Sequence, residues 1–410
     1  RTSTVKAKAE SHTNLKAQIL VKFRRSLVSI HLFKRSIRMR FTIISEHDEM
    51  KKSLIASVRR MRLSEKVEVT DFERALDTVI RTQPAIVLIG LQDERCPRSH
   101  RLVREIQEIA FGKVIVVGPA VEAKALLMFL QEGVYQYIDE ADFESAITIA
   151  INRLHKEQPN GFKRGKVSAV IGAGGGCGAS TLAVNLAFAL VKENPSLVLM
   201  DLNLESGDLT AQLNLRSPHS VSDFCRNVAR MDENMLENCM VQHASGINLI
   251  AAPVAIEEVR DVTPRGLRRL LHMVQSRFDH VVIDVGRPFR QEDVVVLQQA
   301  DTVILTLRSD ISSLRNAKRA LDFLEHSSVD LSKVKPVVNR YRSGSGVTLA
   351  SIRGTLGMEI AQVIPDDARR VNASSNSGVP MCMKKPRSSF SKRIREFVAA
   401  ISAPSQPLAV

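Results

Sequence analysis

The sequence contains no tryptophan, and aromatic residues make up only 4% of its 410 residues. A chain this poor in aromatic side chains is not built around stacking on bases or sugars. No apolar run reaches the roughly 18 positions that a membrane-spanning helix requires, so we expect a soluble protein. The five cysteines are scattered and form no C-x-x-C pair. This pattern argues against a zinc site or a disulfide framework and favours a reducing cytoplasm.

The positive charge is concentrated at one end of the chain. The formal net charge is +14, and residues 1–38 contribute +9 of it through ten Lys or Arg and one Glu. The rest is only mildly basic, so we expect no specific nucleic-acid partner. The first methionine is Met39, and the strand-like run Phe41–Ile44 follows it directly. We therefore expect residues 1–38 to be a basic tail that precedes the native start.

Two alternatives for this basic segment stay open. It can be a disordered basic tail of the native chain. It can also be a membrane-surface helix, because the stretch from Leu15 to Phe33 mixes apolar and basic residues.

Residues 39–154 alternate between strand-like and helix-like stretches. Amphipathic segments such as Phe72–Thr82 and Ser99–Ile109 separate short apolar runs, which are Phe41–Ile44, Ala85–Ile89, Val114–Val117 and Tyr137–Ile138. Such alternation predicts a parallel sheet covered by helices. Residues 155–166 are polar and contain Pro-Asn-Gly, so we expect a linker there.

Residues 167–401 repeat the α/β pattern, and residues 402–410 are expected to form a frayed tail. The strands predicted there are Val167–Ile171, Leu197–Met200, Ile247–Ala251, His280–Ile283, Thr302–Leu307 and Lys335–Val338. We therefore predict an α/β fold with two three-layer α/β domains, each built on a mostly parallel sheet.

Three positions of the first domain bear on its chemistry. The strand in PAIVLIGLQ ends at Gly90, the next strand ends at Gly118, and GVYQYIDEA places Glu140 after the last. The pattern resembles a response-regulator receiver, which is flavodoxin-like. By this resemblance, Gly90 replaces the phosphoacceptor aspartate, Gly118 the Ser/Thr and Glu140 the lysine. Without the carboxylate there is neither a phosphoryl acceptor nor a magnesium nest, so we expect a pseudo-receiver that serves as an interaction module.

The stretch GAGGGCGAST at Gly172–Thr181 stands between an apolar strand and a helix-like segment. Strand, glycine loop and helix in this order are the context of a phosphate-binding loop. Glycines let backbone N–H groups cradle phosphates, and the helix N-terminus adds partial positive charge. A simple strand–helix turn is the alternative, but it needs fewer glycines. The predicted nucleotide-binding residues here are Gly174, Gly175, Gly176, Cys177, Gly178, Ala179, Ser180 and Thr181.

The loop and its flank, GAGGGCGASTLAVNLAFAL, resemble the deviant Walker A motif of the MinD/ParA superfamily of P-loop ATPases. That motif carries two lysines; here Gly174 stands at the signature lysine and Ala179 at the P-loop lysine. Alanine at the second position is typical of the TadZ/CpaE pilus-assembly branch, as is a receiver-like domain ahead of the P-loop domain. Gly174 departs even from that branch, which often has Arg there.

Five further segments carry the same resemblance, one of which, DTVILTLRSDISSLRNAKRALDFL, matches the strand and helix that follow Walker B in that superfamily. LVLMDLNLESGDL matches Walker A′ with Asp201, FDHVVIDVGRP matches Walker B with Asp284, and PVVNRY and VIPDDARRVNASSNSGVP place Asn339 and Pro365 at the nucleotide. The resemblance implies catalytic roles for Asp201 and Asp284, and magnesium held by Ser180 and Asp284. The alternatives are that each aspartate caps the following turn and that Asn339 merely ends a strand.

The two missing lysines set the expected chemistry. A charge-assisted lysine contact to phosphate is worth roughly 1.5–3 kcal/mol. A cation acting on the transferring phosphoryl group contributes on the order of 10³–10⁵ in rate. Backbone amides, Ser180 and magnesium can still bind ATP, but rapid turnover is not expected. Arg287 and Arg290, just after Asp284, are candidate replacement cations; the alternative for Arg287 is an exposed loop charge.

The resemblance therefore implies an ATP-binding spatial organiser of Flp/Tad pilus assembly, with weak or absent hydrolysis. We expect a homodimer that binds proteins of the pilus assembly and secretion machinery. We expect it in the bacterial cytoplasm, at a pole and peripheral to the inner membrane through those partners.

The alternative function is an active MinD/ParA-type ATPase that positions DNA or a membrane-associated cargo. It requires a DNA or membrane surface, for which the amphipathic stretch Phe390–Ile401 is a candidate. We expect this stretch to pack on its own sheet instead. A third class, nitrogenase-reductase-like electron carriers, is excluded because it needs paired cluster-ligating cysteines.

Overall fold

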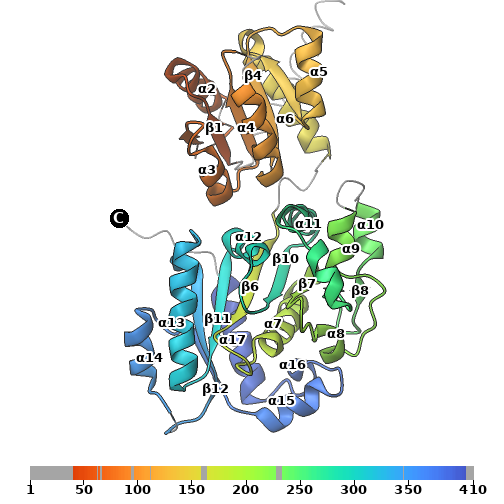
Figure 1. Ribbon diagram of the computed structural model, residues 1–410, viewed down its shortest axis with the longest axis vertical. Helices are drawn as coiled ribbons and strands as arrows, with labels where there is room; N and C mark the ends of the chain where they lie inside the picture. The colour runs from red at the N-terminus through yellow and green to blue at the C-terminus, as the bar shows by residue number, and fades with distance from the viewer. Residues whose placement is uncertain are drawn as a thin grey trace, which may run out of the picture. The chain divides into compact units, whose positions relative to one another are not determined.

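The computed structural model describes residues 40–61, 63–64, 67–93, 97–110, 112–157, 164–227, 233–344 and 346–402. The described residues divide into two compact units, one within residues 1–161 and one within residues 162–410 (Figure 1). The basic tail predicted at residues 1–38 lies outside the described residues, as do residues 403–410 of the predicted C-terminal tail.

The first unit is built on a five-stranded parallel sheet with the order β2-β1-β3-β4-β5. This is the strand order of flavodoxin-like folds. Its elements are β1 (Phe41–Ile44), α2 (Asp48–Arg60), β2 (Val67–Thr70), α3 (Ala75–Thr82), β3 (Ile86–Gly90), α4 (Pro97–Ile109), β4 (Lys113–Gly118), α5 (Ala123–Gln131), β5 (Gln136–Asp139), η1 (Glu140–Asp142) and α6 (Phe143–Glu157).

The parallel sheet predicted for the first unit is confirmed. Strands β1 and β3 are buried at every position, because helices cover both faces of the sheet. Strand β2 was not predicted: its sequence, VEVT, is short and half polar, and it lies at the edge of the sheet.

Gly90 ends β3 at a position where any side chain would clash with neighbouring residues. An ideal Cβ there would lie 2.6 Å from Cγ of Met50 and 3.3 Å from Oγ of Ser45. That hydroxyl donates to the Gly90 carbonyl at 2.9 Å. Gly118 is equally enclosed, since its Cβ would lie 2.6 Å from the hydroxyl of Tyr137. Both strand ends are therefore closed by neighbouring side chains.

Placing the acidic side chain back at Gly90 should destabilise the first unit. We expect Gly90→Asp to lower the free energy of unfolding by about 1–3 kcal/mol, because Met50 must move and a carboxylate becomes enclosed. Urea denaturation followed by circular dichroism measures this. Ala123→Asp, at an exposed position of the same unit, is the control and should change the value by less than about 0.5 kcal/mol. A Gly90→Asp protein as stable as wild type would contradict the enclosure.

The second unit is built on an eight-stranded sheet with the order β13-β12-β11-β6-β10-β7-β9-β8, in which only the β8–β9 pair is antiparallel. Its elements are β6 (Lys166–Gly172), α7 (Ala179–Glu193), β7 (Leu197–Leu202), α8 (Leu209–Gln212), α9 (Val221–Arg226), α10 (Glu233–Asn238), β8 (Val241–Gln242), β9 (Asn248–Ile250), η2 (Ile256–Asp261), α11 (Pro264–Arg277), β10 (His280–Val285), α12 (Gln291–Gln299), β11 (Thr302–Leu307), α13 (Ile311–His326), η3 (Leu331–Lys333), β12 (Val334–Tyr341), α14 (Leu349–Leu356), β13 (Gln362–Pro365), α15 (Ala368–Ser375), α16 (Met381–Lys384) and α17 (Ser389–Ser402).

Two hydrophobic cores lie on opposite faces of this sheet (Figure 1). In β10, Val281 and Ile283 join the core that contains residues of α9, α11, α12 and α13. Val282 joins the core that contains residues of α7 and α17. Because side chains alternate along a strand, Asp284 falls on the α7 face, two residues beyond Val282. By the same alternation Asp201 follows Leu199 onto that face.

Every strand predicted for the second unit is present, although several begin or end at other residues than predicted. The edge strands β8 and β13 were not predicted, because they are short and only partly buried. The segment between the units is shorter than the predicted 155–166 linker, since α6 continues to Glu157 and β6 begins at Lys166. Ser402, assigned to the tail, ends α17.

Helix α17 packs on its own sheet, as expected. It buries Phe390, Ile394, Phe397 and Val398 in the core shared with α7. Across the described residues, no helix has both the length and the apolarity needed to cross a bilayer.

Candidate nucleotide-binding site

The glycine loop joins the end of β6 to the start of α7. Gly176 and Gly178 have φ angles of +70° and +86°, a left-handed conformation that glycine adopts without strain. An ideal Cβ at Gly175 or Gly176 would meet nothing within 4 Å, and both residues are exposed. Gly178 is the N-cap of α7, and no side chain caps that terminus. The loop therefore presents open backbone beside free helix N–H groups, an arrangement that suits an anion.

Neighbouring elements hold the loop in this shape. Cys177 is buried beneath it, with Sγ 2.7 Å from where a Cβ on Gly172 would stand. Asn339, near the end of β12, donates from Nδ2 to the Cys177 carbonyl at 2.8 Å. The same Nδ2 atom lies 2.4 Å from an ideal Cβ on Gly178, so only glycine fits there. The loop is thus supported from the β12 side, while Ser180 and Thr181 are half-buried in the first turn of α7.

Asp201 and Asp284 lie side by side at the ends of β7 and β10, where they are register partners. Their exposed fractions are 1% and 2%. The Asp201 oxygens accept from the backbone N–H groups of Asn203 and Leu209, each at 3.1 Å. Asp284 shares a side-chain hydrogen bond with Ser180, but its Oδ2 has no partner among the described residues. Each Asp201 oxygen therefore has a backbone donor, whereas one oxygen of Asp284 has no partner in the part of the chain that the structure describes.

Burial raises the pKa of both carboxyl groups. The pKa of Asp284 is raised to about 6, an effect that the Ser180 hydrogen bond opposes. The pKa of Asp201 is raised to about 8, where the charge of Asp284 adds to the effect of burial. An unpartnered carboxylate oxygen beside a hydroxyl is a ligand set that suits Mg²⁺, a cation that prefers oxygen. Ser180 and Asp284 therefore fit a magnesium ion.

The affinity for Mg-ATP should fall as the pH is lowered through about 6. Asp284 must be ionised to hold magnesium, and its pKa lies at about 6. Each further pH unit below that value should then cost about tenfold in affinity. Calorimetric titrations between pH 8 and pH 5 measure this. Asp284→Asn is the control, because its affinity changes with pH only through the protonation of ATP itself. Equal slopes for the variant and the wild type would contradict the role of Asp284.

The two arginines that follow Asp284 are engaged differently. Arg287 is exposed, yet its Nη1 donates to the carbonyls of Gly172 and Ala173 at 3.0 and 3.2 Å. Its guanidinium also lies 4.7 Å from the centre of the Phe289 ring. Arg290 is paired with Glu205 instead. Of these two candidate cations, Arg287 alone has a hydrogen bond to the loop, and it binds the first residues of that loop.

One residue at the end of β12 contacts the glycine loop although the sequence did not predict it. Pro365 at the end of β13 is the register partner of Tyr341 in β12, so Asn339 and Pro365 lie on adjacent strand ends. Between them Arg340 reaches the loop, with Nη1 3.4 Å from the Gly176 carbonyl. The only signal for Arg340 in the sequence is a basic residue next to Asn339. The roles predicted for Asn339 and Pro365 toward the nucleotide stay predictions.

Several known proteins are similar to the second unit in sequence and fold. The AAA domain family matches residues 165–333, from just before β6 to η3. The septum site-determining protein MinD of Thermotoga maritima is 25% identical over 255 residues, which cover 60% of this chain and 90% of that protein. A ParA family ATPase from Chlorobium tepidum is 27% identical, with a TM-score of 0.54 over 58% of this chain and 99% of its own. The second unit has the fold of MinD/ParA-type P-loop ATPases.

The MinD/ParA-type fold recurs at lower identity in MinD from Pyrococcus horikoshii, whose structure is a complex with Mg-ADP. That structure is 19% identical, with a TM-score of 0.50 over 58% of this chain and 95% of its own. The predicted P-loop fold is therefore confirmed. The AAA family match includes the loop, Asp201 and Asp284, and ends before Asn339 and Pro365.

Proposed function

We propose that this protein binds ATP with magnesium and hydrolyses it weakly or not at all. The observation that carries the proposal is the buried Asp284 Oδ2, which has no partner within the described residues, beside Ser180 at the open end of a glycine loop. The loop offers backbone N–H groups for phosphates and has no lysine of its own. Binding groups and a magnesium site are thus retained, whereas the cations that accelerate phosphoryl transfer in this fold are missing.

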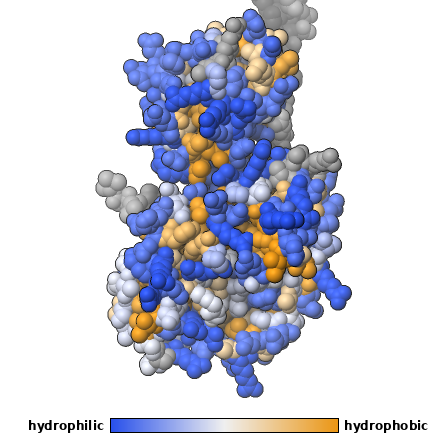
Figure 2. Space-filling view, viewed as in Figure 1, coloured by the Kyte–Doolittle hydropathy of each residue, from blue (hydrophilic) through white to orange (hydrophobic). Residues whose placement is uncertain are grey.

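We propose further that the protein is a spatial organiser of the TadZ/CpaE type for Flp/Tad pilus assembly. In support, a flavodoxin-like unit with glycine at position 90 precedes the MinD/ParA-type domain, whose loop has alanine at position 179. The flavodoxin-like unit also offers an interaction surface. Helix α5 exposes Leu126, Leu127, Met128 and Leu130, with Leu127 58% exposed (Figure 2). We place the protein in the cytoplasm, at a cell pole and peripheral to the inner membrane through its partners.

An exposed apolar segment near Asp201, at the proposed nucleotide site of the second unit, supports a homodimer or partner contact there. Val254 and Ile256 are 91% and 70% exposed. The segment begins at Ala252, whose Cβ lies 2.3 Å from where a Cβ on Gly207 would stand, and that same position is 2.8 Å from Oδ2 of Asp201. The exposed segment is therefore adjacent to the loop that Asp201 holds.

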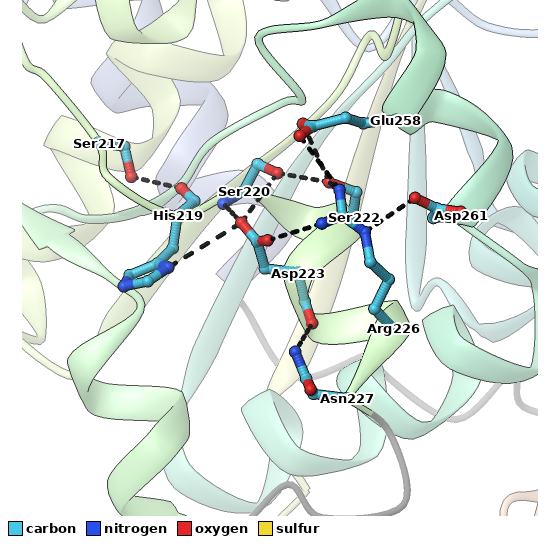
Figure 3. A network of polar contacts seen from close by, with 9 residues as sticks. All are labelled: Ser217, His219, Ser220, Ser222, Asp223, Arg226, Asn227, Glu258 and Asp261. Carbon is cyan, nitrogen blue, oxygen red and sulfur yellow. Dashed lines mark hydrogen bonds and ion pairs between the residues drawn. The ribbon is translucent and has the colours of Figure 1, made fainter.

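A polar network fixes the far end of this segment (Figure 3). Arg226 of α9 donates from Nε to Asp261 at 2.8 Å and pairs with Glu258 at 3.1 Å, so it binds the middle and the last residue of η2. Asp223 forms a capping box with Ser220 at the start of α9. Val254 and Ile256 are thus exposed on a segment that neighbouring residues hold in place, which supports a contact with a second copy or a partner there.

Titration of the full chain with ATP and ADP, with and without magnesium, tests the proposed activity. We expect micromolar, magnesium-dependent ATP binding and single-turnover hydrolysis that is slow or absent. Sedimentation of the ATP-bound protein measures dimer formation. Loss of polar foci and of surface pili on deletion of the gene from its host tests the organiser role. No binding up to millimolar ATP would overturn the proposal.

The second candidate is an active ATPase that positions DNA or a membrane cargo, because the similar proteins include MinD and a ParA family ATPase. Against it, α17 is packed in the core and offers no apolar face to a bilayer. Co-sedimentation with anionic liposomes and with duplex DNA distinguishes the two. Strong ATP-dependent binding to either, together with multiple turnovers, would favour this candidate.

A further inference from the structure

Arg340 connects the glycine loop to the segment after β13. Its backbone has a φ of +55°, a left-handed conformation that is unfavourable for any residue with a side chain. Its N–H donates to Oδ1 of Asn339 at 2.9 Å. The side chain places Nη1 3.4 Å from the Gly176 carbonyl and Nε 3.4 Å from Oδ1 of Asp366. Backbone and side chain together thus aim a cation at the exposed end of the loop.

Asp366 does not depend on Arg340 alone. Arg342 donates from Nε to Oδ2 of Asp366 at 2.7 Å, a shorter contact than the one from Arg340. The Asp366 side chain is only 6% exposed, whereas that of Arg340 is 44% exposed. The buried carboxylate therefore keeps a partner when the exposed arginine moves, and Arg340 is free to exchange its contacts.

The other arginine on the loop is less suited to such an exchange. Arg287 binds two carbonyls and lies over the Phe289 ring, so moving it breaks three contacts. Arg340 has one contact with the loop, and that contact is at Gly176. In front of Gly176 there is open space, since an ideal Cβ there meets nothing within 4 Å. A planar guanidinium is also well matched to phosphate oxygens, because it can offer two parallel donors.

We propose that Arg340 supplies the phosphate-contacting cation that the loop lacks, exchanging the Gly176 carbonyl for a phosphate oxygen of bound ATP. The proposal rests on the ATP binding proposed above and names the residue that compensates for alanine at position 179. It makes Arg340 a determinant of affinity for the phosphate chain, distinct from the magnesium ligands Ser180 and Asp284.

Calorimetric titration of the full-length protein with Mg-ATP and with adenosine tests this. Arg340→Ala should weaken Mg-ATP binding by about 10- to 100-fold and leave adenosine binding within about twofold of wild type. Arg340→Lys keeps the positive charge but lacks the two parallel donors of the guanidinium, so its Mg-ATP affinity should lie between those of wild type and Arg340→Ala. Arg342→Ala is the matched control: it removes the other arginine that binds Asp366, and should bind Mg-ATP within about twofold of wild type.

A rescue separates the proposed contact from a structural role. Adding Ala179→Lys to Arg340→Ala should restore Mg-ATP affinity, because the lysine returns a cation to the phosphates. Unchanged Mg-ATP binding in Arg340→Ala would overturn the proposal, as would an equal loss of adenosine and Mg-ATP affinity that Ala179→Lys does not rescue. A wild-type protein that binds no ATP would remove the proposed function as well. Wild-type binding with an unaffected Arg340→Ala removes the Arg340 role alone.

Discussion

Asp284→Asn is expected to abolish the magnesium-dependent part of ATP binding, a loss of about 100-fold in affinity. The asparagine keeps the shape of the side chain but removes the negative charge of the carboxylate, whose Oδ2 has no partner among the described residues. The same change should make the protein more stable at pH 8. Burial raises the pKa of Asp284 to about 6, so at pH 8 the wild type carries a buried charge and the variant does not. The gain should be at most about 3 kcal/mol.

The sign of this stability difference follows from linkage. A carboxyl group whose folded pKa lies above its unfolded value contributes stability below the unfolded pKa, near 4, and loses it as the pH rises through about 6. The difference between Asp284→Asn and wild type should therefore vanish near pH 4 and grow toward pH 8. Urea denaturation at several pH values without magnesium measures it.

Asp201→Asn is the matched comparison, since Asp201 is equally buried and is the register partner of Asp284. Its two oxygens accept from the N–H groups of Asn203 and Leu209, so each already has a donor. We expect this variant to retain magnesium-dependent ATP binding. If Asp284→Asn kept magnesium-dependent binding, or lowered stability at pH 8, the assignment of the magnesium ligand would be wrong.

Long apolar runs made most of the sheets predictable. Strands β3, β4, β6 and β10 are covered on both faces, so their sequences are almost wholly apolar and stand out against the helices. Edge strands carry no such signal. Strand β2 is VEVT and β13 is QVIP, and each becomes a strand only because a neighbouring strand is there to pair with.

The site residues also differ in how well the sequence predicts them. Those within one short segment could be predicted, and those whose contacts join distant segments could not. The loop, Asp201 and Asp284 could be predicted, because each lies in one short segment with a recognisable strand before it. Arg340 could not be predicted, since its contact with Gly176 needs a left-handed backbone and the side chain of Asp366, which follows β13. For Arg287, the sequence left two interpretations, and the structure shows an exposed arginine that nevertheless binds loop carbonyls.

Restoring both lysines should turn the binding site into a catalyst. We expect Gly174→Lys with Ala179→Lys to raise single-turnover ATP hydrolysis by about 10³-fold, because a cation on the transferring phosphoryl group contributes on the order of 10³–10⁵ in rate. The loop has room for both. An ideal Cβ at Gly174 meets only Nδ2 of Asn316, at the ordinary distance of 3.5 Å. Gly174 has no positive φ, and Ala179 already has a Cβ.

Quenched-flow measurement of phosphate release from Mg-ATP tests this gain, with Gly175→Lys plus Ala179→Lys as the control. Gly175 is the next residue of the same loop, is exposed, and has nothing within 4 Å of an ideal Cβ, so a lysine fits there equally well. The control adds the same total charge at a position that does not match the signature lysine. An equal gain in both variants would mean that added positive charge near the phosphates is sufficient. No gain in either would mean that the obstacle to hydrolysis lies beyond the missing lysines, in groups such as Asp201, whose raised pKa leaves the carboxyl largely protonated near neutral pH.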